Sequence, residues 1–309
     1  MLRSTLLALS RNDKAEHIAR NNPAARTLVN RFVAGNEVAD AVRTCAELSA
    51  AGLLATVDYL GEDTTDLAMA KRTAAAYIEF LVALGEAGLT QRVEVSIKLT
   101  ALGLTLPADG TRIAKELAGE ICAKAAEMGT TVTVDMEDHT TTDSTLEILR
   151  DLRGDFPSTG AVLQAYLHRS QADCVDLSYP GSRIRLVKGA YREPASVAFQ
   201  DKHQVDVSYV RCMAVLLAGS GFPMFATHDP RLIEIAGSLV VKSGREQGTY
   251  EYQMLLGVRP DEQLRLAAAG EQVRVYVPFG DQWYGYLMRR LAERPANLGL
   301  LARSLTSKG

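Results

Sequence analysis

The stretch TVTVDME, residues 131–137, is rich in β-branched residues and ends in two carboxylates that are separated by one residue. Threonine and valine favour strands over helices, and short apolar runs of this kind are typical of strands buried in a parallel sheet. Seven further segments resemble it along the chain: LLATVDYL (53–60), VEVSIKLT (93–100), AVLQAYL (161–167), RIRLVKGA (183–190), FPMFATH (222–228), YEYQMLLG (250–257) and QVRVYVPFG (272–280).

Helical patterns separate most of these expected strands, and several of them end in glycine, the usual residue after a helix C-terminus. Alternation of strands and helices predicts a parallel sheet that is covered by helices. Eight such units in about 250 residues favour a closed (β/α)8 barrel of the TIM type, here expected to be distorted. We expect one domain over residues 1–309, with extra N-terminal helices in residues 1–35 and the barrel at about 50–300.

Composition excludes several classes of protein. The 309 residues include 34 basic and 37 acidic side chains, a net charge of −3, whereas nucleic-acid binders usually carry a basic excess. No segment approaches the roughly 20 apolar residues that a membrane helix needs. The four cysteines are scattered without C-x-x-C spacing, which indicates buried thiols in a reducing cytoplasm rather than a disulfide frame or a zinc site.

Polar residues gather at the ends of the expected strands, which is where a barrel of this type carries its active site. A salt bridge in the barrel mouth would explain any one of them equally well, but eight strands with polar ends favour a shared site. These residues are Asp58, Lys98, Asp135 with Glu137, Gln164, Arg185 with Lys188, Thr227 with His228, Gln253 and Tyr276.

Two further stretches suggest that the site binds an anion. In RLVKGAY (185–191), two cations precede a glycine and an alanine, which allow a close approach to the backbone. In YGYLMRRLAE (284–293), helical spacing places Tyr286, Arg289, Arg290 and Glu293 on one face. Arginine matches a carboxylate or phosphate bidentately, although a solvated face with Arg–Glu pairs is the simpler interpretation of this stripe alone.

Several familiar motifs are absent from the sequence. It contains no G-x-G-x-x-G after a strand, no Walker loop and no G-x-S-x-G elbow. His203 and His228 lack partners at metal-ligand spacing. In DMEDH (135–139), strand alternation turns Asp135 and Glu137 to one side and Met136 to the other, which is poor geometry for a metal cage. We therefore expect no metal site.

The chain resembles the proline dehydrogenase family, flavin-dependent barrel enzymes that begin proline breakdown. The resemblance covers most of the chain and lies at the end of nearly every expected strand. It is carried by SIKLTALG (96–103), VDME (134–137), LQAYLHRS (163–170), RLVKGAY (185–191), FATHD (225–229), YEYQML (250–255) and VYVPFG (275–280), followed by YLMRRLAERPAN (286–297).

The resemblance implies non-covalent FAD across the barrel mouth and L-proline as the substrate. Positions that match the family's flavin contacts are Met136, Gln164, Arg185, Val187, Lys188, Gly189, Ala190, Thr227, His228 and Gln253. Positions that match its substrate contacts are Lys98, Asp135, Tyr191, Tyr276, Tyr286, Arg289 and Arg290.

By the same resemblance, Arg289 and Arg290 are expected to hold the proline carboxylate, which would explain why they share one helical face. Asp135 and Arg185 are the catalytic residues: Lys98 and Asp135 are expected to form an ion pair beneath the substrate, and Arg185 to stabilise the reduced flavin.

Two further residues take roles near the substrate. Glu62 matches a family acid that pairs with a clamp arginine and gates the site, and Tyr276 is expected to lie against the edge of the proline ring. Nothing in the sequence names the base that removes the ammonium proton. Arg192 and Asp229 stand where common relatives differ, which affects only the expected contacts at the flavin edge.

The resemblance also implies partners. Electrons are expected to pass to a quinone at the membrane surface, so the enzyme would be cytoplasmic or peripheral on the inner face of the membrane, where LGLLARSL (298–305) could touch the bilayer. 1-Pyrroline-5-carboxylate dehydrogenase is the expected pathway partner, and the length favours a monofunctional enzyme. A barrel enzyme acting on another cyclic amino acid and an inactive binding barrel are the rival interpretations.

Overall fold

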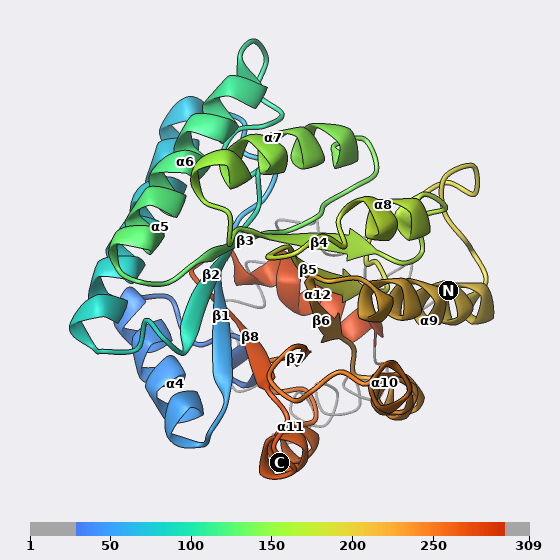
Figure 1. The fold of residues 1–309 in the computed structure, drawn as a ribbon. Helices are drawn as coiled ribbons and strands as arrows, with labels where there is room; N and C mark the ends of the chain where they lie inside the picture. Colours follow the sequence, from blue (N-terminus) through green and yellow to red (C-terminus); the bar gives the residue numbers. More distant parts are fainter. Residues whose placement is uncertain (1–28, 294–309) are drawn as a thin grey trace, which may run out of the picture.

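Eight parallel strands close into a barrel in the order β1 to β8 (Figure 1), in a computed structural model that describes residues 29–293. The expected (β/α)8 fold is therefore confirmed. Most of the N-terminal extension and the tail 298–305 lie outside the described residues. The strands are β1 Leu54–Tyr59, β2 Val93–Ile97, β3 Val132–Val134, β4 Gly160–Gln164, β5 Arg183–Val187, β6 Phe222–Ala226, β7 Glu251–Leu255 and β8 Val273–Phe279.

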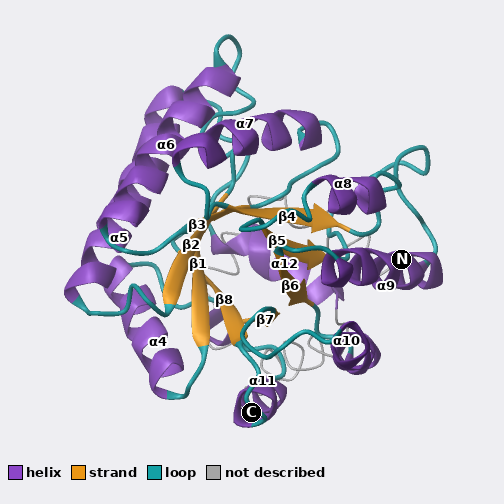
Figure 2. Cartoon of the chain, viewed as in Figure 1, coloured by secondary structure: helices purple, strands orange, loops and turns teal. Residues whose placement is uncertain are grey.

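Helix α4 precedes β1 and one helix follows each strand; most of them surround the barrel, whereas α12 lies behind the strands in the view of Figure 2. Asp66, Asp201 and Asp229 cap three of them by accepting a hydrogen bond from a backbone N–H of the first turn. No helix within residues 29–293 combines the length and apolar character needed to cross a bilayer. The helices are α4 Val38–Ala50, α5 Leu67–Glu86, α6 Gly110–Glu127, α7 Thr142–Asp155, α8 Ser170–Asp176, α9 Lys202–Ala218, α10 Pro230–Ser243, α11 Pro260–Ala268 and α12 Trp283–Glu293.

The strand predicted from TVTVDME is shorter than expected: β3 covers only Val132–Val134. Asp135 still donates its backbone N–H to the carbonyl of Ile97 at 2.8 Å, so pairing with β2 continues for one residue before the chain leaves the sheet. The two carboxylates of the motif therefore stand at the carboxyl end of the barrel, where a change of chain direction frees their side chains from the sheet.

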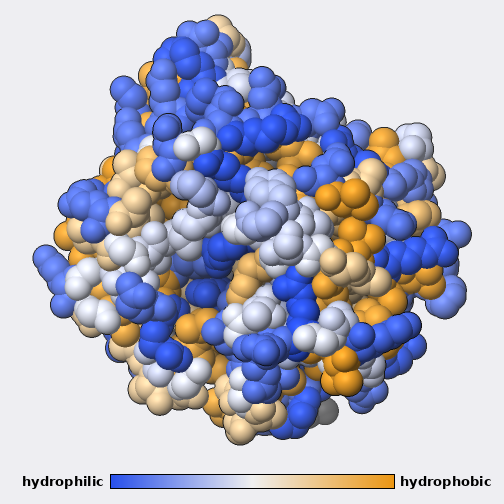
Figure 3. Space-filling view, viewed as in Figure 1, coloured by the Kyte–Doolittle hydropathy of each residue, from blue (hydrophilic) through white to orange (hydrophobic). Residues whose placement is uncertain are grey.

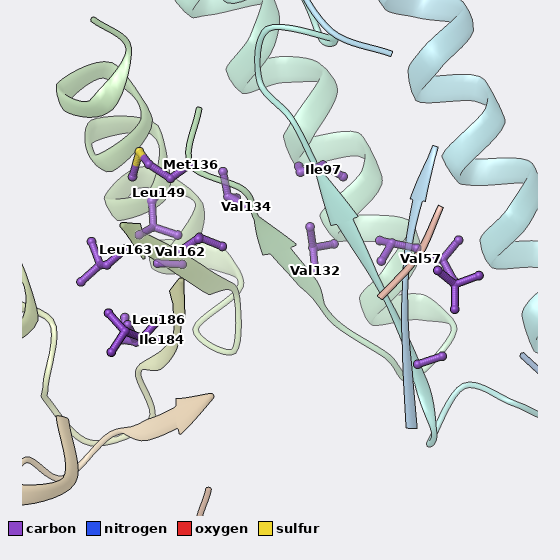
Figure 4. Close-up of a cluster of buried hydrophobic side chains, with 14 of the residues drawn as sticks. Val57, Ile97, Val132, Val134, Met136, Leu149, Val162, Leu163, Ile184 and Leu186 are labelled. Atoms are coloured by element: carbon purple, nitrogen blue, oxygen red, sulfur yellow. The ribbon is translucent and has the colours of Figure 1, made fainter. Parts of the chain in front are cut away.

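Apolar side chains of the strands pack against the helices that surround the barrel. Val57, Ile97, Val134, Leu163 and Leu186 belong to one continuous buried cluster, part of which Figure 4 shows. Each is at most 2% exposed, so the strands bury their apolar residues against the surrounding helices as a parallel barrel requires.

The interior of the barrel carries charges as well as apolar groups. Glu94 on β2 is 2% exposed, and its carboxylate lies 2.6 Å from Arg183 on β5 and 3.9 Å from Arg274 on β8. Arg274 also pairs with Glu251 on β7 at 2.8 Å. Burial alone would raise the pKa of Glu94, but the charges of Arg183, Arg274 and Arg185 outweigh it and hold that pKa at about 2. The pairs of Glu94 connect β2 to strands that are not its neighbours, whereas Arg274 and Glu251 join the adjacent strands β8 and β7.

We expect Glu94→Gln to lower the free energy of unfolding by about 3–5 kcal/mol at neutral pH, because the variant leaves buried guanidinium groups without their carboxylate. The folded pKa lies below the ordinary value of 4.5, so this stabilisation is present above that pH and is lost as pH falls toward about 2. Urea unfolding at several pH values measures the difference. Glu116→Gln, which removes an exposed ion pair with Arg112, is the matched control and should cost less than about 1 kcal/mol. Equal costs for the two variants would contradict a stabilising role for the Glu94 network.

Candidate active site

Asp135 and Arg185 form a buried ion pair at the carboxyl end of the barrel. Arg185 Nη1 donates to Asp135 Oδ1 at 2.6 Å and to the hydroxyl of Ser96 at 2.8 Å. Tyr276, from β8, donates its phenolic proton to the other oxygen of Asp135 at 2.7 Å, and its ring lies 5.4 Å from the Arg185 guanidinium carbon. One hydrogen-bond network thus joins β2, the end of β3, β5 and β8. Each of its polar side chains is hydrogen-bonded to another member.

The expected ion pair between Lys98 and Asp135 is wrong. Lys98 Nζ instead lies 2.5 Å from Asp58 at the end of β1. Asp58 is 1% exposed and would be a buried charge without a cation, whereas Asp135 already has Arg185 as its partner. Burial alone would lower the pKa of Lys98, but Asp58 and Asp135 raise it above its ordinary value, which keeps the ammonium group charged.

Arg185 is held from a second side by Gln253 of β7, whose side-chain oxygen accepts from Arg185 Nε at 2.5 Å. The amide nitrogen of Gln253 in turn donates to Glu251 at 2.5 Å. This chain of hydrogen bonds fixes the orientation of the Gln253 amide. The guanidinium group of Arg185 is thereby locked in one plane.

Gln164, at the end of β4, has an acceptor that no protein group satisfies. Its amide nitrogen donates to the carbonyl oxygen of Met136 at 3.3 Å. Its side-chain oxygen is buried and has no hydrogen-bond partner among residues 29–293. An unpaired buried acceptor is costly, so this oxygen is suited to a ligand that carries an N–H or O–H donor.

The turn after β5 depends on Gly189. Its φ of +112° lies in a region that L side chains rarely adopt, and a Cβ there would meet the Tyr166 ring at 2.3 Å. Val187 precedes this turn and Ala190 follows it. Lys188 is not a free surface cation, because its ammonium group lies 2.5 Å from Asp206 and 3.1 Å from Asp229.

Thr227 and His228 follow β6 and are also held in place. The Thr227 hydroxyl accepts from the backbone N–H of Asp229 at 3.2 Å. The Nε2 of His228 accepts from the backbone N–H of Leu255 at 2.9 Å, so this ring ties the end of β6 to the end of β7. Asp229, the last residue of FATHD, stands where common relatives differ. Its contacts with Lys188 and Thr227 hold both residues in place.

A cavity of about 970 Å³ opens among the loops at the strand ends and α12. Of the residues expected at the site, Glu62, Lys188, Gly189, Ala190, Tyr191 and Arg289 line it. The structure thus brings together the loop after β1, the turn after β5 and α12, which lie far apart in sequence. In the view of Figure 1, α12 lies behind the strands, so the hydrophilic hollow near the middle of the face in Figure 3 is on the side away from α12.

The two arginines of α12 have different surroundings. Arg289 lines the cavity and pairs with Glu62 at 2.5 Å. The guanidinium carbon of Arg290 lies 5.1 Å from the centre of the Tyr286 ring, which is itself buried. The simpler interpretation of the stripe, a solvated face with Arg–Glu pairs within the helix, does not fit Arg289, because its partner comes from the loop after β1.

Glu137 was expected only as one of the polar residues at the strand ends, and the sequence assigned it no role in the site. It lines the cavity and is 4% exposed. Thr100 donates to its carboxylate from the backbone N–H at 3.0 Å and from the hydroxyl at 2.5 Å. Burial raises the pKa of Glu137 to about 7 in spite of these bonds. The signal was present in the alternation of VDME, which turns Asp135 and Glu137 to the same side.

A second group of polar residues that the sequence did not indicate lies at the cavity edge. Glu193 accepts from the backbone N–H of His139 at 2.9 Å and from the Tyr166 hydroxyl at 3.3 Å, and it contacts Nδ1 of His139. These residues join the loop after β3 to the chain after β5. No sequence motif links residues 54 positions apart.

Known proteins resemble this chain along its whole length. A family model described as proline dehydrogenase matches residues 41–303. Proline dehydrogenase 1 of Bacillus subtilis (strain 168) is 37% identical over 308 residues, with 100% of both chains covered. Proline dehydrogenase of Deinococcus radiodurans is 38% identical over 307 residues, covering 99% of this chain and 98% of the relative.

Among solved structures, proline utilization A (PutA) from Bdellovibrio bacteriovorus, inactivated by N-propargylglycine, has the same barrel with a TM-score of 0.83. The match covers 99% of this chain at 24% identity, and this chain spans 38% of that longer protein. At this identity the likeness shows the fold alone.

We expect Gly189→Ala to destabilise the fold by about 1–3 kcal/mol more than Gly181→Ala, as measured by urea unfolding. Both glycines have positive φ, so both variants carry backbone strain, but a Cβ at Gly181 meets nothing within 4 Å. The difference therefore isolates the contact with Tyr166. Equal costs would show that the Tyr166 ring moves aside freely and that the turn does not need glycine for its close approach.

Proposed function

Because the chain belongs to the proline dehydrogenase family, we propose that it oxidises L-proline to 1-pyrroline-5-carboxylate by hydride transfer to the N5 atom of non-covalent FAD. The main support for a carboxylate substrate is the position of Arg289. Helix α12 brings this cation to a cavity that is also lined by Tyr191 and by the turn after β5. A guanidinium group in such a cavity suits a small carboxylate.

In the proposal, Arg289 and Arg290 hold the carboxylate, and Tyr191, Tyr276 and Tyr286 surround the substrate ring. Arg289 is paired with Glu62, so a substrate carboxylate would compete with Glu62 for the donors of this arginine. Glu62 would thereby act as a gate, because its pair with Arg289 joins the loop after β1 to α12. Lys98, held by Asp58, adds positive charge from the floor of the site.

The residues at the ends of β3 to β7 fit a flavin. The unsatisfied oxygen of Gln164 needs a donor, and flavin rings carry an N–H group. The turn at Gly189 and Ala190 presents backbone with almost no side chain, which allows a flat ring to approach closely. The residues that would hold FAD are Met136, Gln164, Arg185, Val187, Lys188, Gly189, Ala190, Thr227, His228 and Gln253.

The protein's own contribution to the reaction is orientation and charge. FAD, when bound, supplies the two-electron acceptor for the hydride. Arg185, fixed by Asp135 and Gln253, holds a positive charge in a buried position where a reduced, anionic ring would be stabilised. The carboxylate clamp aims one carbon of the substrate ring, and such orientation is a large part of what a bimolecular step gains in an enzyme.

The electrons are proposed to continue to a quinone at the inner face of the membrane, and 1-pyrroline-5-carboxylate to a separate dehydrogenase. The proposed chemistry requires an acceptor, because a reduced cofactor must be reoxidised, whereas the quinone and the separate dehydrogenase are proposed from the resemblance to the family.

We expect the purified protein to carry FAD whose absorbance near the flavin band bleaches on anaerobic addition of L-proline and not at a comparable rate with NADH. The physical reason is the clamp, which orients a small carboxylate, a group that NADH does not carry. Anaerobic absorption spectroscopy measures it. A folded protein that takes up no flavin on reconstitution would refute the proposed cofactor, and flavin that D-proline bleaches as fast as L-proline would refute the clamp.

We expect Arg289→Met and Arg290→Met each to raise KM for L-proline at least tenfold with FAD content near normal, because a charge-assisted hydrogen bond contributes about 1.5–3 kcal/mol. Steady-state kinetics and the flavin-to-protein absorbance ratio measure the two quantities. Lys115→Met, which removes an exposed cation on α6, is the control and should leave both unchanged. A variant that loses flavin and keeps its KM would place that arginine at the cofactor instead of the substrate.

A further inference from the structure

We propose that Glu137 is the base that takes the ammonium proton of the substrate before the hydride leaves. This inference rests on the proposed function. L-Proline at neutral pH carries a protonated ring nitrogen, which has no lone pair to drive departure of a hydride from the adjacent carbon. A nearby proton acceptor must therefore act first or in the same step.

The position of Glu137 suits this role. It lines the cavity that Arg289, Tyr191 and Glu62 also line, so a carboxylate held by Arg289 leaves the rest of a small ring among these groups. Its side chain comes from the loop directly after β3, two residues beyond Asp135. Asp135 itself is unsuited, because Arg185, Ser96 and Tyr276 already occupy its two oxygens.

The partners of Glu137 leave it free to accept a proton. Thr100 is neutral and donates one bond to each oxygen, so each oxygen keeps a lone pair. No cation lies within ion-pair distance of Glu137 among residues 29–293. The pKa of about 7 matches this environment, since burial disfavours the charged form more than the Thr100 bonds favour it. A base near neutrality is the kind that general base catalysis favours.

Charged and titratable groups from each neighbouring element face this carboxylate. Lys98 after β2 lowers its pKa and Glu62 after β1 raises it, while the Glu137 charge raises the pKa of the Tyr191 phenol after β5. The groups that line the same cavity with it are Glu62, Asp63, Asp138, His139, Lys188, Tyr191, Arg192, Glu193, Lys202 and Arg289.

The step balances as follows. The ring N–H bond breaks and its proton forms an O–H bond on Glu137, leaving the nitrogen lone pair on neutral amine. The lone pair then forms the C=N bond as the hydride, with its two electrons, leaves the ring carbon for the oxidant of the proposed function. The product is the protonated imine, and Glu137 returns its proton to solvent through the open cavity.

The test is the pH dependence of kcat/KM for L-proline. In the holoenzyme, the plot of kcat/KM against pH should rise through about pH 7 and then level off, because only the Glu137 carboxylate form is active. This rising part of the plot is called the limb. Glu137→Gln should lower kcat by about 10²–10⁴-fold and abolish this limb. His139→Gln, which removes the histidine of the cavity, should keep the limb. If His139→Gln removes it and Glu137→Gln does not, the proposal is overturned.

A second pair of variants keeps the proposal testable if Glu137→Gln does not fold. Thr100→Val removes the hydroxyl that donates to Glu137, so the pKa rises and the limb should move to higher pH. Thr100→Ser retains a hydroxyl and should keep the limb at its wild-type position. A limb that stays in place in Thr100→Val would overturn the proposal.

Ligand binding gives a readout that does not depend on turnover. Calorimetric titration of the wild-type holoenzyme with cyclopentanecarboxylate, which has the carboxylate and ring but no amine, should show no loss of affinity as pH falls below 7. The affinity of this ligand should also be unchanged in Glu137→Gln, which would show that the clamp is intact. Weaker binding of this ligand in Glu137→Gln would mean that Glu137 helps to form the carboxylate site, against the proposal. A wild-type protein that does not oxidise L-proline at all would refute the proposed function instead.

Discussion

The ion pair between Arg185 and Asp135 is the interaction on which the rest of the site depends. It joins β5 to the end of β3 across the barrel at 2.6 Å, and Ser96, Tyr276 and Gln253 are oriented by one or other of its members. Below it, Glu94 and Glu251 neutralise the remaining arginines of the interior. Because buried charges are tolerated only in pairs, the positions of these side chains are fixed together, and the barrel mouth is preorganised before any ligand arrives.

Much of the architecture could be predicted from local sequence. The strand segments, the glycines after helices and the polar residues at strand ends together predicted the barrel and the edge that carries the site, because strand propensity and alternation are local properties. The boundaries were less certain, as the early end of β3 at Val134 shows. The shape of the sheet at that point depends on pairing with Ile97, a contact that no local pattern contains.

The partners of charged residues could not be predicted in the same way. Lys98 was expected to pair with Asp135 and instead pairs with Asp58, because several acids and cations share the mouth and the choice depends on which carboxylate has no other partner. Glu137 was visible as an acid beside Asp135, but its raised pKa comes from burial, which is a property of the assembled cavity. The contact of Glu62 with Arg289 was expected from the family, while its role as a gate remains a prediction.

The seam that closes the barrel has a consequence for how the chain is assembled. β1 and β8 share six paired positions, from Leu54 with Arg274 to Tyr59 with Phe279, and Arg274 donates across the seam to the carbonyl of Ala55 at 2.8 Å. Arg274 and Ala55 are 219 residues apart, so a chain growing on the ribosome cannot form this contact until β8 has emerged. Until then β1 has an unpaired edge on one side, and the earlier strands form an open sheet that must avoid pairing with other chains. Because α12 follows β8 in sequence, the site cannot be completed before the strand that closes the barrel has been synthesised.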